Sequence, residues 1–207
     1  MTSNNTILKI SNSRRNILEI LELYQGYDVS AYKNFSINEI DAMYSNEQLD
    51  MLVKHKEEDK KTYVKFYVNK TLRNNVLDNM ISTLFDEEQL REKDNLIVIV
   101  LDEPNDSLCT HVNHLFKKKG IFVVVHNIKR LQYNILQHDF VPEMTIMNTD
   151  DIEELKTKYN LTSITQLPEI NRFDPQALAM SMRPGDVGVF SRKSVTTLEN
   201  NYYRICV

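Results

Sequence analysis

Two uninterrupted apolar runs, at residues 96–101 and 121–125, constrain the fold of this chain most strongly. A run that is apolar at every position is typical of a strand buried on both faces of a sheet. The segment between them is expected to form a helix from about Asp106 to Lys119, which ends at Gly120. A strand, a helix and a second strand in this order predict a β-α-β unit with a parallel strand pair.

The preceding residues add helices and a hairpin to the same domain. Apolar residues at helical spacing predict a helix over residues 13–26, with Ser13 as its cap. Ser36 followed by Glu39 is the pattern of a capping box and predicts a short second helix. Alternating apolar residues at 49–53 and a β-branched and aromatic run at 62–68 predict two strands joined by a charged turn.

Two further elements complete this domain. The apolar face of another helix is expected at Leu72, Val76, Met80 and Leu84. Alternation at Leu131, Tyr133 and Ile135 predicts one more strand before His138. Together these elements predict a mixed sheet flanked by helices.

The composition changes near residues 138–144, where we place a domain boundary. The later residues predict a helix capped at Asn148 or Thr149, a brief helix that begins at Pro175, and closing strands at 187–192 and 202–207. The fold class is therefore α+β with two domains: an N-terminal α/β domain at residues 1–140 and a compact C-terminal α+β domain at 141–207.

Composition narrows the classes of function. The 207 residues carry a formal net charge of −4, so the surface as a whole is not built to bind nucleic acid. Only four glycines are present, and no glycine-rich phosphate-binding fingerprint occurs. Two distant cysteines, and the lack of a signal peptide or a bilayer-length apolar run, lead us to expect a soluble intracellular protein without membrane contact.

Six short motifs follow one another in the last third of the chain. They occupy residues 138–142, 166–170, 174–175, 183–186, 191–194 and 203–206. None is specific alone, because pieces such as Asp-Pro and Pro-Gly-Asp are ordinary turn chemistry. In this order they resemble the small subunit shared by all three eukaryotic nuclear RNA polymerases, which is the fifth subunit, and its archaeal counterpart. The resemblance runs without gaps from His138 to Val207, and farther upstream it covers mainly the order of elements.

The resemblance implies a non-catalytic subunit without a cofactor, present as a single copy in a multisubunit DNA-directed RNA polymerase. The C-terminal domain would dock on the largest subunit, near other small subunits, and the N-terminal domain would form part of the lower jaw around downstream duplex DNA. The residues that would form the subunit interface are Pro142, Leu167, Pro168, Asp174, Pro175, Arg183, Gly185, Arg192, Ser194, Tyr203 and Arg204.

The charged residues of the closing strands have a second interpretation. Arg192, Lys193 and Arg204 lie on strands that otherwise look like core. They could be edge-strand charges that discourage aggregation. The resemblance favours ion pairs with larger subunits, which would be desolvated on assembly.

A weak, non-specific DNA contact is expected at one of two places. The resemblance points to the start of the helix after the apolar strand, at Pro104, Asn105 and Ser107, although Glu103 and Asp106 would oppose a phosphate there. Charge points instead to Lys117, Lys118 and Lys119 at the other end of that helix. These lysines also suit the negative end of the helix dipole without any DNA.

Several positions depart from the family pattern: Met144, Val195, Leu198 and Asn200. The last three alter the hairpin at residues 195–201 and leave its family contact open. With the abundant asparagine, they favour a large DNA virus as the source, which would place the protein in the virion and the host cytoplasm. A cellular eukaryotic source would place it in the nucleus.

Two functions of other classes remain as alternatives. A metal-dependent endonuclease on the first domain would use Asp102 and Glu103 with Lys65, yet neither strand carries the acid-x-Lys step of such enzymes. A free-standing adaptor for transcription factors is the other alternative. His111 and His114, with Cys109 nearby, have a spacing compatible with two metal ligands but lack the four ligands of a structural zinc site.

Overall fold

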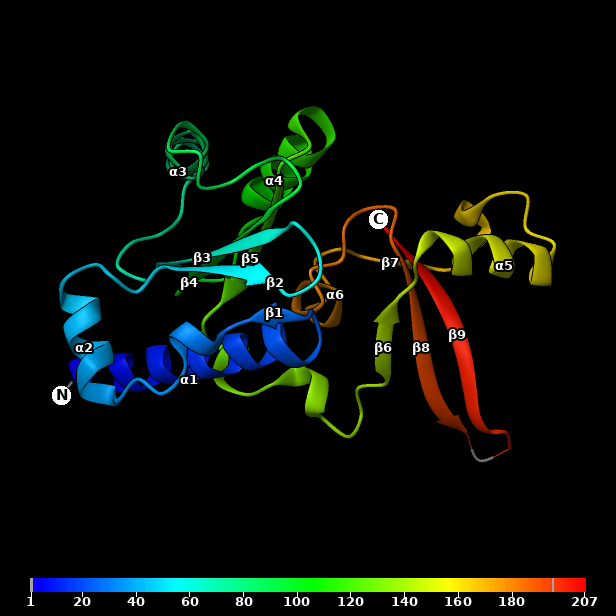
Figure 1. Cartoon of the computed structure of the whole chain (residues 1–207), viewed down its shortest axis with the longest axis horizontal. Coiled ribbons are helices and arrows are strands. Elements are labelled where there is room, and N and C mark those ends of the chain that lie inside the picture. The colour runs from blue at the N-terminus through cyan, green and yellow to red at the C-terminus, as the bar shows by residue number, and fades with distance from the viewer. Residues whose placement is uncertain (1, 195) are drawn as a thin grey trace. The chain divides into compact units, whose positions relative to one another are not determined.

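The computed structural model describes residues 2–194 and 196–207, with the side chains of residues 5–193 and 196–207. The chain divides into two compact units, Met1–Asn134 and Ile135–Val207, which we call the first and second unit. Each unit has its own sheet, and both mix helices with strands (Figure 1). The α+β class with two sheets is therefore confirmed.

The first unit is built on a mixed sheet of five strands in the order β1-β2-β3-β4-β5. The strands are β1 (Tyr27–Asp28), β2 (Met51–His55), β3 (Lys61–Tyr67), β4 (Asn95–Val100) and β5 (Phe122–Asn127). The first three pair antiparallel, and β3, β4 and β5 pair parallel. The predicted β2–β3 hairpin and the parallel β-α-β unit are both confirmed.

Helices cover both faces of this sheet. They are α1 (Thr2–Leu23), α2 (Ile37–Ser45), α3 (Asn74–Asp86) and α4 (Asp106–Lys119). Figure 1 shows α1 on one face and α3 and α4 on the other. Every residue of β4 and β5 is buried, as expected for strands enclosed on both sides. No helix of the described residues is long and apolar enough to cross a membrane.

Local capping chemistry fixes several helix ends as predicted. The Ser36 hydroxyl accepts from the Glu39 backbone, and the Glu39 carboxylate accepts from the Ser36 N–H, so the capping box is complete. Gly120 ends α4 with φ of +68°, a left-handed conformation that suits glycine. The Asn105 side chain accepts from the Leu108 N–H and caps the start of the same helix.

The predicted start of the first helix is wrong, because α1 already begins at Thr2. Ser13 is buried within the helix, and its hydroxyl donates to the Ile10 carbonyl at 2.9 Å. Ser13 therefore bonds back into the helix and caps nothing. Ile7 and Ile10 are buried and continue the apolar stripe towards the N-terminus.

The predicted strand after Leu131 is also wrong. Two 3-10 turns occupy this segment, η2 (Arg130–Gln132) and η3 (Ile135–Gln137). The Leu131 N–H donates to the carbonyl of Ile128 at 3.3 Å, which is a local turn bond and not a bond to a neighbouring strand. Leu131 is buried whereas Tyr133 is exposed. Three residues therefore alternate as they would in a strand, although the segment forms two turns.

The buried face of α3 differs from the predicted one. Its buried residues are Leu77, Ile81 and Leu84. Of the four predicted positions only Leu84 lies on this face, and Leu72 is buried just before the helix begins. Two apolar series at helical spacing overlap in this segment, and contact with the rest of the unit selects between them.

The second unit has a four-stranded sheet in the order β6-β8-β9-β7. Its elements are β6 (Glu143–Ile146), α5 (Thr149–Tyr159), the 3-10 turn η4 (Ile164–Gln166), β7 (Glu169–Ile170), α6 (Pro175–Ala179), β8 (Val187–Ser194) and β9 (Leu198–Cys206). Asn148 caps α5, because its side chain accepts from the Asp151 N–H. The core of the unit is Met144, Ile170, Ala177, Met180, Met182, Phe190 and Cys206.

Candidate assembly interface

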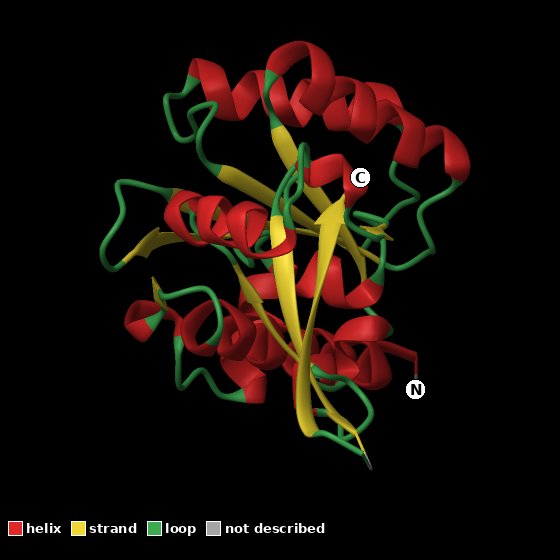
Figure 2. Ribbon diagram, turned by 90° about the vertical axis from the view of Figure 1, so that its right-hand side faces the viewer, coloured by secondary structure: helices red, strands yellow, loops and turns green. Residues whose placement is uncertain are grey.

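The β8–β9 hairpin extends beyond the other strands of its sheet. β6 pairs with residues 188–191 of β8, and β7 pairs only with Ile205 and Cys206 of β9. Residues 192–194 and 198–200 therefore pair only with each other among the described residues, and we call them the hairpin arm. Figure 2 shows the two strands twisting around each other towards this end. Val195, which the altered hairpin includes, lies outside the described residues.

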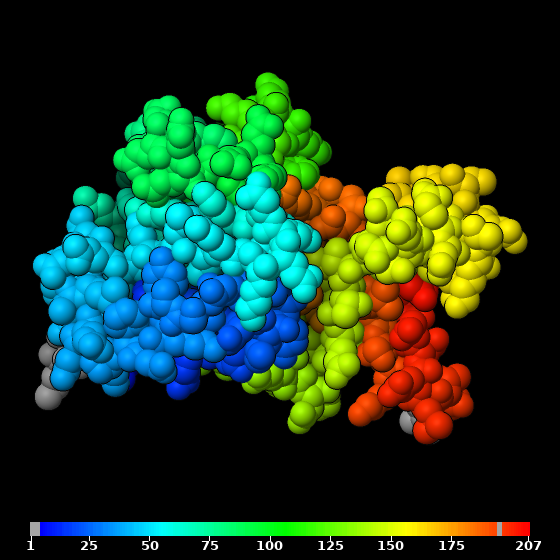
Figure 3. Space-filling view, viewed as in Figure 1, coloured from blue at the N-terminus to red at the C-terminus, as the bar shows by residue number. Residues whose placement is uncertain are grey.

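The hairpin arm presents cations and an apolar side chain to solvent. Arg192 and Lys193 are exposed, and Leu198 is 84% exposed. Figure 3 shows the surface of the C-terminal segment, which includes β9, in red. A two-stranded ribbon without a further strand or helix is only marginally stable in water. The exposed charges make the arm a candidate surface for complementary contacts with a partner.

Two other predicted interface residues are engaged within the unit. The Arg204 guanidinium donates to the Glu169 carbonyl at 3.1 Å and lies 5.8 Å from the centre of the Tyr202 ring. The Tyr203 ring meets the Tyr159 ring edge-on, with 5.8 Å between their centres, and so joins α5 to the sheet. Both residues therefore stabilise the base of the hairpin, whatever else they contact.

The turn at residues 183–186 ties the end of the helical segment to β9. The Arg183 N–H donates to the Asp186 carboxylate at 2.7 Å. The Gly185 N–H donates to the Cys206 carbonyl at 2.9 Å, and the Cys206 N–H donates to the Asp186 carbonyl at 2.8 Å. Gly185 has φ of +99°, as predicted for a turn position that favours glycine.

The proline-containing motifs also build the fold of this unit. The Asp174 carboxylate accepts from the Gln176 N–H at 2.9 Å and caps α6, with Pro175 in the first turn. The Gln176 amide then donates to the Pro142 carbonyl at 2.7 Å, and the Pro168 carbonyl accepts from β9 at 2.9 Å. These residues shape the surface that the unit presents.

The remaining predicted position on a loop, Leu167, is half-buried after η4. The side chain of Ser194 lies outside the described residues. Several large apolar side chains that the predicted interface omitted are exposed in the same unit, among them Phe140 at 91% and Ile146 at 39%. Phe140 lies within the first of the six motifs. An apolar residue in that motif was the sequence signal that could have added Phe140 to the predicted interface.

Comparison with known proteins identifies the second unit. Residues 133–206 match the family described as RNA polymerase Rpb5, C-terminal domain. The DNA-directed RNA polymerase subunit Rpo5 of Thermococcus onnurineus is 41% identical over 76 residues, which are 37% of this chain and 92% of the relative. The same subunit of Nitrosopumilus maritimus is 38% identical over 79 residues, or 38% of this chain and 94% of the relative.

This chain belongs to the Rpb5 family. The matched region coincides closely with the second unit, Ile135–Val207, and contains all six motifs. The Rpb5 relationship therefore rests on the unit that carries the hairpin arm. All but the last two residues of the first unit lie outside the matched residues.

The two sets of residues considered for DNA contact lie at opposite ends of α4. Asn105 caps its start, and the Ser107 hydroxyl accepts from the Asn74 amide at 3.3 Å. Pro104 and Asn105 line a small recess of ≈ 30 Å³ that also includes Asp102. The last turn is formed by the exposed lysines Lys117, Lys118 and Lys119. A helix of 14 residues is about 20 Å long, so these lysines lie about that far from its start. One phosphate cannot contact both sets.

The residues of the alternative endonuclease are not brought together. The Lys65 ammonium pairs with the Asp50 carboxylate at 2.6 Å. Lys65 lies opposite Val98 in the β3–β4 register, so Asp102 lies about 13 Å farther along the strand direction. Glu103 instead forms an ion pair with Arg130 at 3.0 Å. These acids are engaged in separate structural contacts.

One histidine of the pair on α4 contacts a carboxylate of the neighbouring helix. His111 contacts the Asp78 carboxylate of α3 at 2.8 Å, whereas His114 is exposed. Among the described residues, no group of three or more His, Cys, Asp or Glu side chains is placed to hold a metal ion. Burial, followed by the Asp186 charge, raises the pKa of the Cys206 thiol to about 11, so this cysteine stays protonated at neutral pH.

Proposed function

We propose that this Rpb5-family chain is a non-catalytic subunit of a multisubunit DNA-directed RNA polymerase. The observation that carries the proposal is the match to archaeal polymerase subunits over nearly their whole length, at 41% identity for Thermococcus onnurineus. The chemistry of nucleotide addition would then belong to other subunits, and this chain would contribute position and charge. It would be found wherever that transcription machinery works.

The second unit is the part proposed to dock on the largest subunit, near other small subunits. Three observations support this role: the matched family covers this unit, the Pro168, Asp174 and Gly185 motifs are hydrogen-bonded into it, and the hairpin arm pairs with no further strand among the described residues. Arg192, Lys193 and Leu198 on the arm offer charge and apolar area to a partner. Because Arg204 already bonds within the unit, a change there would mix folding with docking.

The first unit is proposed to act as part of a jaw beside downstream duplex DNA. With a net charge of −4, any such contact has to be local, which suits the three exposed lysines at the end of α4. Replacing Lys117, Lys118 and Lys119 by Ala would then lower the salt dependence of DNA binding by the assembled polymerase. An unchanged slope against salt concentration would remove these lysines from the proposal.

The assembly proposal is tested by affinity purification of the tagged chain from its native source, followed by a salt wash. We expect two very large polymerase subunits to be recovered in amounts equal to the chain. The double variant Arg192→Glu with Lys193→Glu should lose these subunits, whereas Lys158→Glu, an exposed charge on α5, should retain them. Recovery of the wild-type chain without large subunits would contradict the proposal.

The source is tested separately. A viral origin is favoured by the asparagine-rich composition and the altered hairpin, and it would place the chain in virions. Mass spectrometry of purified particles would detect the chain together with the large polymerase subunits. Their absence from particles would direct the search to the nucleus of a cellular eukaryote.

A further inference from the structure

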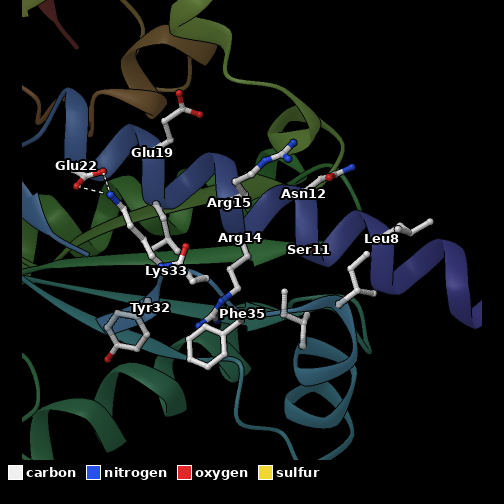
Figure 4. A pocket seen from close by; sticks show the side chains of 14 residues that line it. Leu8, Ser11, Asn12, Arg14, Arg15, Glu19, Glu22, Tyr32, Lys33 and Phe35 are labelled. Carbon is white, nitrogen blue, oxygen red and sulfur yellow. Dashed lines mark hydrogen bonds and ion pairs between the residues drawn. The ribbon is translucent and has the colours of Figure 1, made fainter. Parts of the chain in front are cut away.

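A cavity of ≈ 650 Å³ opens in the first unit between α1 and the segment that leads into α2. Its walls come from α1, the short 3-10 turn η1 (Ser30–Tyr32), the loop after it and the first residues of α2. Figure 4 shows these side chains. The volume is in the range of pockets that bind small molecules or peptide side chains.

An incompletely bonded arginine lies at this cavity. Arg14 is only 2% exposed, and its Nη1 donates to the Leu49 carbonyl at 2.9 Å. Its Nε and Nη2 have no hydrogen-bond partner among the residues that the structure describes. Burial lowers the pKa of this guanidinium, although arginine stays charged at neutral pH. A buried cation without an anionic partner is costly, so the site favours a ligand that supplies one.

Two aromatic rings cover the guanidinium in place of an anion. The Arg14 Cζ lies 5.8 Å from the centre of the Tyr32 ring and 5.3 Å from that of the Phe35 ring. Cation–π attraction offsets part of the missing hydrogen bonding. Tyr32 is fixed because its hydroxyl bonds both backbone groups of Leu52.

Phe35 is the side chain that can uncover Arg14. It is 36% exposed and lies in a loop after Asn34, which has φ of +68°. Figure 4 shows Arg14 extending from α1 towards the Phe35 ring. Because Nε and Nη2 are buried, a ligand would reach them only if a covering side chain such as this exposed ring rotated away.

The walls indicate the chemistry of the ligand. Leu8 and Ile37 are about half exposed at the rim, at 49% and 50%, so the apolar surface continues beyond the cavity. A small inorganic anion would leave this rim uncovered, whereas a peptide would bury it. Arg15 and Lys33 line the same cavity as Glu19 and Glu22, and Lys33 forms an ion pair with Glu22, so these four charges balance. Arg14 therefore leaves one net positive charge, which a single carboxylate matches better than a dianionic phosphate does.

From these contacts we propose that the cavity binds an acidic peptide segment of a partner protein. One carboxylate of that segment pairs with Arg14, and flanking apolar side chains lie against Leu8 and Ile37. This site is separate from the hairpin arm and does not depend on the polymerase role. Its occupant is a protein segment, not a nucleic acid.

The test is a selection of random peptides displayed on phage against the immobilised full chain. Enriched peptides should carry Asp or Glu beside apolar residues. In fluorescence-polarisation titrations, changing that acid to its amide should weaken binding to the wild-type chain at least about tenfold, as expected for a lost charged hydrogen bond. The same change should have no effect on binding to Arg14→Met, because the partner charge is already absent.

Surface variants keep the test decisive if Arg14→Met folds poorly. Leu8→Glu at the rim should weaken the selected peptides at least about tenfold by removing apolar contact and adding repulsion. Leu23→Glu is the matched control, because Leu23 is an exposed leucine of α1 that does not line the cavity. Its peptide affinity should equal that of the wild-type chain.

Other outcomes overturn the proposal. Enrichment of peptides without an acid, no enrichment at all, or affinity indifferent to both Arg14→Met and Leu8→Glu would exclude an acidic-peptide site. A submillimolar response of the Arg14 Nε–H NMR signal to acetate or inorganic phosphate would assign the cavity to a small anion. Self-association in sedimentation that Leu8→Glu abolishes would assign it to a second copy of the chain.

Discussion

His126 should make the stability of the first unit depend on pH. It lies in β5 opposite Ile99, is 3% exposed, and its Nε2 has no hydrogen-bond partner among the described residues. Burial, followed by the nearby Arg130 charge, lowers the pKa of this imidazole from 6.5 to about 4. The folded unit therefore keeps His126 neutral at pH values where the unfolded chain protonates it.

The sign and size of the effect follow from these two pKa values. Between pH 6.5 and about 4 the unfolded state binds more protons, so stability is full above pH 6.5 and is lost as the pH falls towards the folded pKa. The whole shift corresponds to about 3 kcal/mol, and about 2 kcal/mol of that should already be lost at pH 5.

The assay is urea unfolding at about pH 7.5 and pH 5, followed by circular dichroism and tyrosine fluorescence because the chain has no tryptophan. The free energy of unfolding should change between the two pH values by about 2 kcal/mol less in His126→Phe than in the wild-type chain. His114→Gln, at an exposed histidine of α4, should keep the wild-type difference. Other titrating groups affect all three chains alike.

Parallel pH profiles for the wild-type chain and His126→Phe would refute this reasoning. If His126→Phe does not fold, the imidazole pKa can be measured directly by NMR in the wild-type chain. A His126 pKa near 6.5 would show that the buried ring is hydrated or hydrogen-bonded. The predicted pH dependence of stability would then be refuted.

Three further substitutions test a helix cap, a turn and the surroundings of Tyr63. Ser36→Ala should cost about 1 kcal/mol in urea unfolding by removing the capping box, whereas Ser45→Ala at the other end of the helix should be nearly neutral; equal effects would discount the cap. Gly185→Ala should destabilise the second unit by about 1 kcal/mol, because alanine disfavours φ of +99°, and an unchanged melting temperature would contradict this. Asp50→Asn should lower the raised pKa of Tyr63, which is caused first by burial and then by the Asp50 charge; an unchanged ultraviolet titration would remove the Asp50 charge as a cause.

Sequence reasoning succeeded where the determining interactions are local. The apolar run of β4, the Ser36–Glu39 capping box and the Gly120 helix end all depend on neighbours in the chain, and each is found as predicted. The family relationship was also readable, because the six motifs lie in a fixed order within the matched residues 133–206. The roles of the interface residues stay predictions.

Local patterns failed where more than one arrangement satisfied them. Three alternating residues after Leu131 imitated a strand, and two overlapping apolar series competed for the buried face of α3. Ser13 had the identity of a cap but lies inside a longer helix. In each case the choice was made by residues distant in the sequence.

The sequence by itself therefore determined the fold class, most element positions and the family, since periodicity, capping and motif order are written in neighbouring residues. Only the tertiary structure decided that the Asp174, Gly185 and Arg204 motifs bond within the second unit, and that the hairpin arm stands without further strands among the described residues. It alone also placed Arg14 in a cavity beneath Phe35. Burial and hydrogen-bond completion depend on contacts between segments far apart in the chain, and no local pattern encodes them.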